Sequence, residues 1–338
     1  MKALKNNYFL EPFSHIYVEK KAYDYPLSKI ILEKFKNSKV IFIDNYNEIF
    51  SRNNQNPYIQ KLSPSLIIAV KTRELIYKGS RLCHDFKEEN FYYTNFILNC
   101  LFDCDYCYLK GMNLSSYPLF FVNLNDYFLE INKLIKDKKR IYLSISYDSD
   151  ILLFERLYPF LEEWLNFAKK NSQVNIEIRT KSTNYKKFLD FDPSENVIIS
   201  WSLTPEEVIS RFERKTPSLR KRLEAASKLL EKGWKINLAL DPLIYLDNTW
   251  EETYKNFINT ILKEIEIEKI NSFTLGVFRI PSIYLKRMKK FSTSPLAFYP
   301  YQTKRGIATY PEDLKIKMIN YVKNMLEEHV DSSKIYII

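Results

Sequence analysis

Three of the four cysteines in this chain lie within eight residues, and no other feature limits its possible folds as strongly. Cys100, Cys104 and Cys107 have the spacing C-x3-C-x2-C, whereas Cys83 stands apart. Four cysteines placed at random would rarely gather so closely, so the cluster needs a metal-binding, redox or packing role. Disulfide frameworks are typical of small secreted domains, and a chain of this length can bury its core without them.

The spacing favours a metal centre in which three thiolates come from one loop. A structural zinc site needs four ligands, and the chain has only three histidines, His15, His84 and His329. A [4Fe–4S] cluster also normally takes four cysteines, so three would leave one iron open to a cofactor. This spacing, with Tyr106 before the last cysteine, is typical of radical S-adenosyl-L-methionine (AdoMet) enzymes. Zinc binding and three buried structural cysteines are the alternatives.

Composition excludes two common nucleotide-binding folds. The five glycines are too widely spaced for a Rossmann fingerprint or a P-loop, which need several glycines within a few residues. We see no signal peptide and no membrane span, so we expect a cytoplasmic protein that has no membrane partner. The net charge of +10 is compatible with nucleic-acid binding, but a lysine-rich composition explains it equally well.

Short apolar runs alternate with amphipathic stretches after the cysteines, which predicts βαβ units and a parallel sheet. The predicted strands are 91–98, 140–146, 174–180, 196–203, 235–241 and 270–278, and the predicted helices are 124–138, 151–171, 183–190, 217–232 and 249–267. Six strands suit an α/β fold built as a partial (β/α)6 radical SAM barrel. The cysteine loop follows the first strand, at the carboxyl edge where such folds carry their reactive groups.

The regions on either side of this barrel are predicted to be smaller. Residues 1–90 form an N-terminal α/β segment, 91–280 the barrel, and 281–338 a C-terminal helix and strand extension that binds substrate. In the first segment we expect strands at 15–20, 39–44 and 65–71, a helix at 27–37 and a loop at 52–57; in the last, an extended stretch at 298–310, a helix at 311–328 and a strand at 334–338.

Several motifs resemble the spore photoproduct lyase family, radical SAM enzymes that repair a UV-induced thymine dimer in spore DNA. They are CDYCYLKGMN with PLFFVNLNDY, EKKAYDYPLSKIILEKF, SLIIAVKT, SYDSDI, RTKS, WSLTPEEVISRFE, LALDPLIY and WEETY. The likeness spans roughly residues 15–260 and is weaker beyond. It implies that Cys100, Cys104 and Cys107 hold a [4Fe–4S] cluster.

The resemblance also implies an AdoMet site. Ser149, Lys181 and Ser202 match the positions that bind AdoMet, and each lies at or just after the end of a predicted strand. Ser149 is also suited to cap the following helix, Lys181 is one of many lysines, and Ser202 could be an interior strand residue. Tyr106 and Tyr108 match tyrosines implicated in holding the cofactor and in hydrogen transfer, although 25 tyrosines could supply them by chance.

Tyr147 is the main departure from the family pattern. It stands where the family has the cysteine that donates a hydrogen atom, and no cysteine follows Cys107. The candidates for this catalytic role are Cys83, which could equally be a small buried hydrophobe, and a relay through Tyr147, Tyr106 or Tyr108.

The partners expected from the resemblance are UV-damaged DNA and a one-electron donor such as ferredoxin or flavodoxin. Such an enzyme flips its target base out of the stack and holds the phosphate backbone with basic residues. Basic and aromatic residues interleave at 286–291 and 298–310, where Lys304 and Arg305 are candidate contacts, together with Arg279 at a strand end. Ala308 replaces a glycine expected in the hairpin at this point, and solvated surface is the simpler reading of such patches.

The sequence therefore predicts a radical SAM lyase that reverts the spore photoproduct to two thymines through a 5′-deoxyadenosyl radical. One alternative is a related radical SAM enzyme with another substrate, which Tyr147 favours. The other is a metal- or DNA-binding module without activity.

Overall fold

Two mainly parallel sheets build the protein, described here from a computed structural model that covers residues 13–80, 86 and 88–338. The larger sheet has eight strands in the order β18-β14-β13-β11-β10-β9-β5-β4. Its strands are β4 (Ile76–Lys78), β5 (Phe91–Thr94), β9 (Ile141–Ser144), β10 (Val174–Thr180), β11 (Val197–Ser202), β13 (Lys235–Leu243), β14 (Ser272–Val277) and β18 (Ile335–Ile337).

The predicted six-stranded barrel is confirmed by the central part of this sheet. Strands β5, β9, β10, β11, β13 and β14 follow one another in chain order, and each is parallel to the next. β18 extends the sheet in parallel at one edge, and β4 pairs antiparallel with β5 at the other. Because the six strands share one direction, their carboxyl ends meet along one edge.

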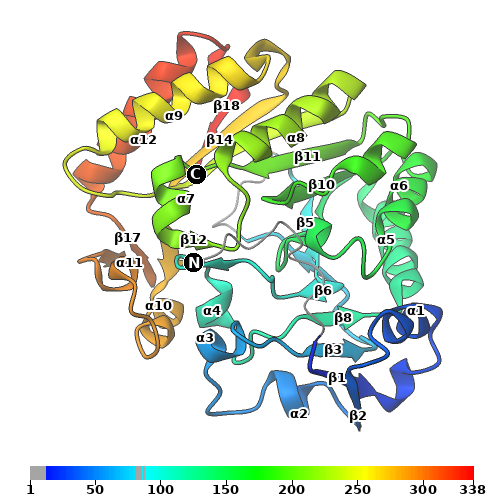
Figure 1. The fold of residues 1–338 in the computed structure, drawn as a ribbon. Helices are drawn as coiled ribbons and strands as arrows, with labels where there is room; N and C mark the ends of the chain where they lie inside the picture. The colour runs from blue at the N-terminus through cyan, green and yellow to red at the C-terminus, as the bar shows by residue number, and fades with distance from the viewer. Residues whose placement is uncertain (1–12, 81–85, 87) are drawn as a thin grey trace.

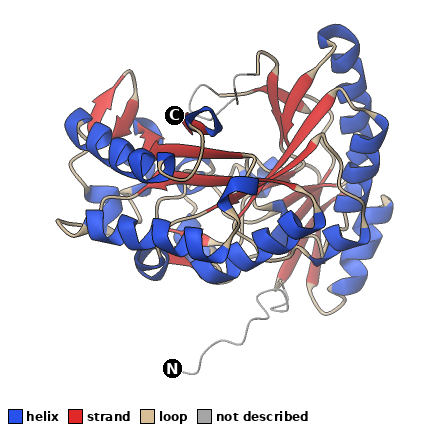
Figure 2. Ribbon diagram, turned by 90° about the horizontal axis from the view of Figure 1, so that it is seen from above, coloured by secondary structure: helices blue, strands red, loops and turns tan. Residues whose placement is uncertain are grey.

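Helices cover the outer side of the curved sheet, as Figures 1 and 2 show. The helix α8 ends at Gly233, whose φ of 101° supplies the left-handed residue that closes a helix. The helices are α1 (Pro26–Lys34), α2 (Asn47–Phe50), α3 (Pro57–Gln60), α4 (Leu109–Met112), α5 (Leu124–Lys138), α6 (Leu161–Lys170), α7 (Glu206–Phe212), α8 (Leu219–Lys232), α9 (Trp250–Glu264), α10 (Ser282–Met288), α11 (Pro295–Phe298) and α12 (Glu312–Glu327).

Three predicted elements of the barrel are wrong in detail. The strand expected at 91–98 is split, because β5 joins the large sheet whereas β6 (Ile97–Leu98) pairs with β8 in the other sheet. The helix expected at 151–171 is a 3-10 turn at Ile151–Leu153 followed by α6. The helix at 183–190 is only a 3-10 turn, Lys186–Asp190. Pairing with the other sheet decided the first of these elements, which an apolar period alone does not reveal.

The smaller sheet crosses the predicted boundary between the N-terminal segment and the barrel. Its order is β2-β1-β3-β8-β6, in which β8 and β6 come from residues beyond 90. The chain therefore returns to this sheet directly after the cysteine loop, which ties the loop to both sheets. The strands are β1 (His15–Glu19), β2 (Lys39–Ile43), β3 (Leu66–Ala69), β6 (Ile97–Leu98) and β8 (Leu119–Phe121).

The C-terminal segment forms the expected hairpin despite Ala308. Strands β16 (Gln302–Lys304) and β17 (Ile307–Thr309) are joined by Arg305 and Gly306, both at positive φ, and β17 also pairs with β15 (Arg279–Pro281). Such a two-residue turn needs positive φ at its two central residues only. Ala308 lies in the strand, where an ordinary side chain is accommodated, so the hairpin needs no glycine at this position.

Within the described residues, no helix is both long and apolar enough to cross a membrane.

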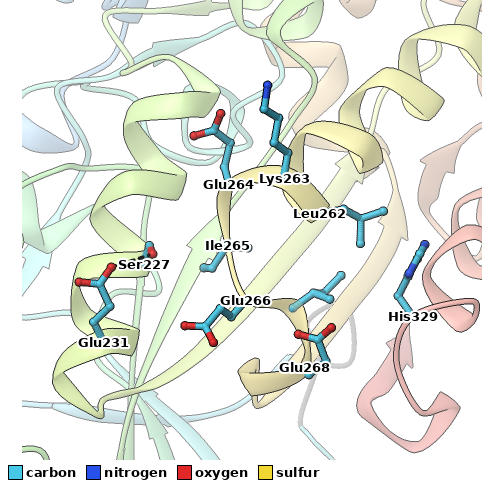
Figure 3. Close-up of a pocket in the computed structure, with 10 residues that line it drawn as sticks. Ser227, Glu231, Leu262, Lys263, Glu264, Ile265, Glu266, Glu268 and His329 are labelled. Carbon is cyan, nitrogen blue, oxygen red and sulfur yellow. Dashed lines mark hydrogen bonds between the residues drawn. The ribbon is translucent and has the colours of Figure 1, made fainter.

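A hollow between α8, the end of α9 and His329 is lined mainly by charged side chains such as Glu231 and Glu264 (Figure 3). Residues 262–268 of its wall immediately precede β14, so the hollow lies at the amino end of that strand, away from the edge that carries the cysteines.

Candidate active site

The cysteine loop leaves the sheets at the carboxyl side of β5 and β6. Cys100 and Cys104 are buried and Cys107 is partly exposed. Within the loop, β7 (Asp103–Cys104) pairs antiparallel with β12 (Glu213–Arg214), which places Cys104 opposite Glu213. The loop closes with a turn in which the amide of Cys107 donates to the carbonyl of Cys104 at 3.2 Å, and α4 follows. The loop therefore follows the first strands of the sheet, at their carboxyl side, as the sequence predicted.

The chemistry of the three thiols suits an iron–sulfur cluster. Burial raises the pKa of Cys100 to about 12 and raises that of Cys104 well above its ordinary value, and the charge of a Cys107 thiolate raises both further. Coordination to iron supplies the positive charge that keeps such thiols deprotonated. Among the described residues no three side chains lie close enough together for a single metal ion, but a cubane cluster spreads its cysteine ligands more widely than one ion does.

Ion pairs and main-chain hydrogen bonds hold the loop, although one of the cations, Arg214, keeps 53% of its side chain exposed. Lys110 lies 2.6 Å from Asp103, and Arg214 reaches Asp103 at 3.0 Å and Asp105 at 2.5 Å. Lys61 donates to the carbonyls of Cys100 and Phe102. Because Asp103 and Asp105 alternate with the cysteines, cations from three places in the chain fix the loop through its acidic side chains and its main chain.

A second buried group binds Tyr106. Its hydroxyl donates to Glu213, and Arg222 donates to the other carboxylate oxygen of Glu213 at 2.5 Å. Burial alone would raise the pKa of Glu213, but the positive charges of Arg222 and Lys181 lower it to about 2. Glu213 is therefore an anion that receives hydrogen bonds from Tyr106, Arg222 and Thr204. The ammonium of Lys181 lies 5.6 Å from the centre of the Tyr106 ring.

The tyrosines on the other side of the loop meet the residues that follow β9. The Tyr108 hydroxyl donates to the carbonyl of Tyr147 at 2.8 Å and to Asp148 at 3.1 Å. Ser149 donates to the carbonyl of Asn99, next to the first cysteine, at 2.7 Å. Ser149 thus does not cap a helix, and the structure brings it and Tyr147 beside the cysteine loop.

Two further predicted site residues, Ser202 and Arg279, bind other parts of the protein. Ser202 is buried at the end of β11, where its carbonyl accepts from Arg222 at 3.1 Å. Arg279 forms a two-pronged ion pair with Asp241, at 2.7 and 3.2 Å. A side chain at Gly276 would collide with this pair, since its Cβ would lie 2.7 Å from the Arg279 guanidinium.

Two cations lie outside this group. Lys304 and Arg305 are exposed at the turn of the β16–β17 hairpin. The hairpin is connected to the cysteine loop through α10, because Gly111 in α4 has no Cβ and lets the main chain of Tyr284 approach closely. Cys83 lies outside the described residues.

Sequence reasoning missed the buried ions that hold the loop. Asp103 and Asp105 carry a signal, since two acids alternate with the cysteines. Arg222 carries another, because it falls on the buried stripe of α8 with Leu219 and Leu223, where charges are rarely found without a partner. Glu213 lies more than a hundred residues from the loop, and no local pattern connects the two.

Comparison with known proteins decides the family. A sequence model described as spore photoproduct lyase matches residues 11–295. The chain belongs to the spore photoproduct lyase family. Spore photoproduct lyase from Bacillus subtilis strain 168 is 24% identical over 251 residues, which cover 73% of this chain and 72% of that protein. The enzyme from Clostridium acetobutylicum is 25% identical over 274 residues, 77% and 78% of the two chains.

Solved structures of spore photoproduct lyases share this fold. A spore photoproduct lyase complexed with dinucleoside spore photoproduct superposes with a TM-score of 0.82 at 21% identity, covering 97% of this chain and 99% of the other. A double mutant with bound AdoMet and dinucleoside spore photoproduct gives 0.81 at 21% identity, covering 96% and 98%. At this identity the likeness shows the fold, and it confirms the radical SAM architecture expected from the sequence.

Proposed function

We propose that this chain is a spore photoproduct lyase that returns the spore photoproduct in DNA to two thymines. Membership of the family over residues 11–295 is the observation that carries this proposal. Spore photoproduct lyases related in fold have been solved with AdoMet and with the dinucleoside spore photoproduct. The cysteine loop, with its three thiols at the carboxyl edge of a parallel sheet, supports the same chemistry.

The cysteines hold the cluster in this proposal, and the surrounding residues bind AdoMet. Cys100, Cys104 and Cys107 are the iron ligands, and the cluster with AdoMet supplies the 5′-deoxyadenosyl radical that begins repair. Tyr106 is in the loop and donates to Glu213, and Lys181 lies against the Tyr106 ring. Ser149, which follows β9, and Ser202, at the end of β11, would complete the AdoMet site by offering hydroxyl groups at the carboxyl edge of the sheet.

Damaged DNA binds next to the hairpin in this proposal. Lys304 and Arg305 are exposed cations at its turn and are suited to phosphate. Arg279 is already paired with Asp241, so it positions the strand end rather than offering a free charge to phosphate. An external one-electron donor such as ferredoxin or flavodoxin reduces the cluster.

Tyr147 favours a second candidate function, a related radical SAM enzyme with another substrate. This position would normally hold the hydrogen-donating cysteine of the family, and here it holds a tyrosine whose main-chain carbonyl accepts the hydrogen bond of the Tyr108 hydroxyl. We assign the return of the hydrogen atom to the phenol of Tyr147, whose ring stacks on Tyr93. Cys83 is the competing donor.

An anaerobic assay tests both candidates. The reconstituted protein is given AdoMet, dithionite and an oligonucleotide that carries the spore photoproduct, and thymine and 5′-deoxyadenosine are measured together. Repaired thymine supports the lyase, whereas 5′-deoxyadenosine without repair supports the second candidate. Cys104→Ser is the negative control, because it removes an iron ligand and should lose both products and bound iron. Cys83→Ser should retain iron.

A further inference from the structure

Three tyrosine rings form a continuous stack beside the proposed hydrogen donor. Tyr77 on β4 and Tyr93 on β5 are directly paired across the strands, and their ring centres are 5.0 Å apart with planes at 18°. Tyr93 in turn stacks on Tyr147 at 4.0 Å and 19°. Offset-stacked aromatic pairs usually lie 4.5–7 Å apart, so the inner pair is unusually close. We call these three residues the tyrosine stack.

The two ends of the stack have different surroundings. At the inner end, the carbonyl of Tyr147 accepts the hydrogen bond of Tyr108 in the loop that holds the cysteines. At the outer end, the ammonium of Lys71 donates to the Tyr77 hydroxyl at 2.7 Å and to Asn95 at 2.8 Å. All three rings are partly exposed. The stack therefore connects the cysteine-loop side of the sheet with β4, the edge strand, where a lysine adjoins the last phenol.

We propose that the tyrosine stack is a hydrogen-atom relay, which carries the radical left on Tyr147 outward through Tyr93 to Tyr77. This inference rests on the proposed function, since repair supplies the substrate radical. Tyr147 is the residue that touches substrate, and Tyr93 and Tyr77 act through it. The absence of a cysteine at position 147 gives the relay its purpose, because a phenol that has donated must be restored before the next turnover.

Each step of the relay conserves atoms and electrons. The carbon radical formed when the thymine bridge breaks takes a hydrogen atom from the Tyr147 O–H bond, leaving a phenoxyl radical. Tyr93 gives Tyr147 a hydrogen atom, and Tyr77 gives one to Tyr93. The phenoxyl radical of Tyr77 is then reduced by one electron from the same class of low-potential donor that reduces the cluster, and it takes a proton from the Lys71 ammonium, which solvent replaces.

The arrangement suits this transfer because the partners are chemically identical. When a hydrogen atom passes from one phenol to another, an O–H bond breaks and an O–H bond forms. The rate then depends on how close the two phenols lie, and each stacked pair brings its two rings into contact. A stack with a purely structural role would need the rings but not their hydroxyl groups. Replacing tyrosine with phenylalanine separates the two roles, because phenylalanine keeps the ring and lacks the O–H bond.

A radical trap at the outer end tests the relay. In reconstituted protein, Tyr77→3-aminotyrosine places a phenol that is oxidised more easily than tyrosine at the end of the stack. Samples frozen during turnover with AdoMet, dithionite and the dinucleoside spore photoproduct are examined by electron paramagnetic resonance, and 5′-deoxyadenosine and thymine are measured in parallel. We expect an aminotyrosyl radical at position 77, lost when Tyr93→Phe is added although 5′-deoxyadenosine still forms.

Tyr92→3-aminotyrosine is the matched control. Tyr92 precedes Tyr93 on β5, and successive strand residues point to opposite faces, so this trap should stay silent. The relay is overturned if repair proceeds while position 77 stays silent, or if the signal at 77 survives Tyr93→Phe. Failure of the unmodified protein to form 5′-deoxyadenosine or thymine would overturn the proposed function itself, and the relay with it. Iron content and circular dichroism equal to those of the unmodified protein establish that Tyr93→Phe folds.

Discussion

Arg222 and Arg305 carry the same guanidinium group in opposite environments. Arg222 is fully buried and donates to Glu213, Thr216 and the carbonyls of Pro217 and Ser202. Arg305 lies exposed at the turn of a hairpin. The first has exchanged water for fixed partners, whereas the second keeps its hydration and its charge available to a ligand.

The two arginines show that the net charge of the chain does not tell which of its cations are free to bind a ligand. The excess of ten positive charges does not reveal which cations face solvent. Around the cysteine loop, Lys61, Lys110 and Arg222 are buried and have protein partners. These cations position the loop, as does Arg214, which is half-exposed but paired with Asp103 and Asp105. We therefore expect DNA binding to depend on exposed cations such as Lys304 and Arg305 at the hairpin turn. The predictions below test this division.

The largest expected effect is that of Arg222→Met. Removing one member of a buried ion pair leaves an uncompensated charge and costs about 3–5 kcal/mol, so the free energy of unfolding should fall by that amount in urea titrations. Arg220→Met on the same helix is the control. Arg220 has 76% of its side chain exposed and contacts Glu264 at 3.3 Å, and exposed pairs contribute about 0–1 kcal/mol. Equal losses in the two variants would refute the division.

The architecture could be predicted because its signals are local. The six barrel strands and the long helices α5, α8 and α12 were predicted within a few residues, since each has a clear apolar period. The split of 91–98 could not be predicted, because both halves are apolar and only the pairing of Ile97 with Phe120 in the other sheet separates them. Tertiary contacts, rather than propensity, decided that element.

The site could be predicted only where its residues share a motif. The cysteines and the two loop tyrosines lie within one nine-residue stretch of sequence, and family resemblance indicated Ser149 and Lys181. Glu213 approaches Cys104 through a two-residue strand pairing, and Tyr93 approaches Tyr147 through a parallel register. Both contacts depend on how distant segments pair, and a single sequence carries no signal of that pairing.

An intermediate effect is expected at Lys71, which is buried and, among the described residues, has no carboxylate in hydrogen-bond contact. Burial lowers the pKa of Lys71 to about 8, although Asp148 and Glu74 oppose this. An unfolded lysine has a pKa of about 10.4, so the unfolded chain binds more protons between these values and stability rises with pH. The rise should reach about 3 kcal/mol at most, and it should be absent from Lys71→Met in urea titrations from pH 7 to 10.

The exposed Lys78 on β4 provides the control for this pH series. Lys78→Met removes a lysine from the neighbouring edge strand, and Lys78 is exposed, so the rise in stability should remain. Titration of tyrosines affects all three proteins alike and cancels when each variant is compared with the unmodified chain. If the free energy of unfolding of Lys71→Met rises with pH by the same amount, Lys71 is hydrated in the folded protein and behaves like an exposed cation.

The smallest effect on stability, and the most selective effect on binding, is expected at the hairpin turn. Replacing Lys304 and Arg305 together with glutamine should change the free energy of unfolding by no more than about 0.5 kcal/mol, since neither side chain is buried. Binding to an oligonucleotide should weaken. Each lost phosphate contact should reduce the slope of log K against log salt by about 0.7–0.9.

Replacing Lys169 and Lys170, exposed at the end of α6, removes the same charge elsewhere. If both double variants change the salt slope equally, the hairpin acts only through net charge, and exposure alone does not make a cation part of the DNA site.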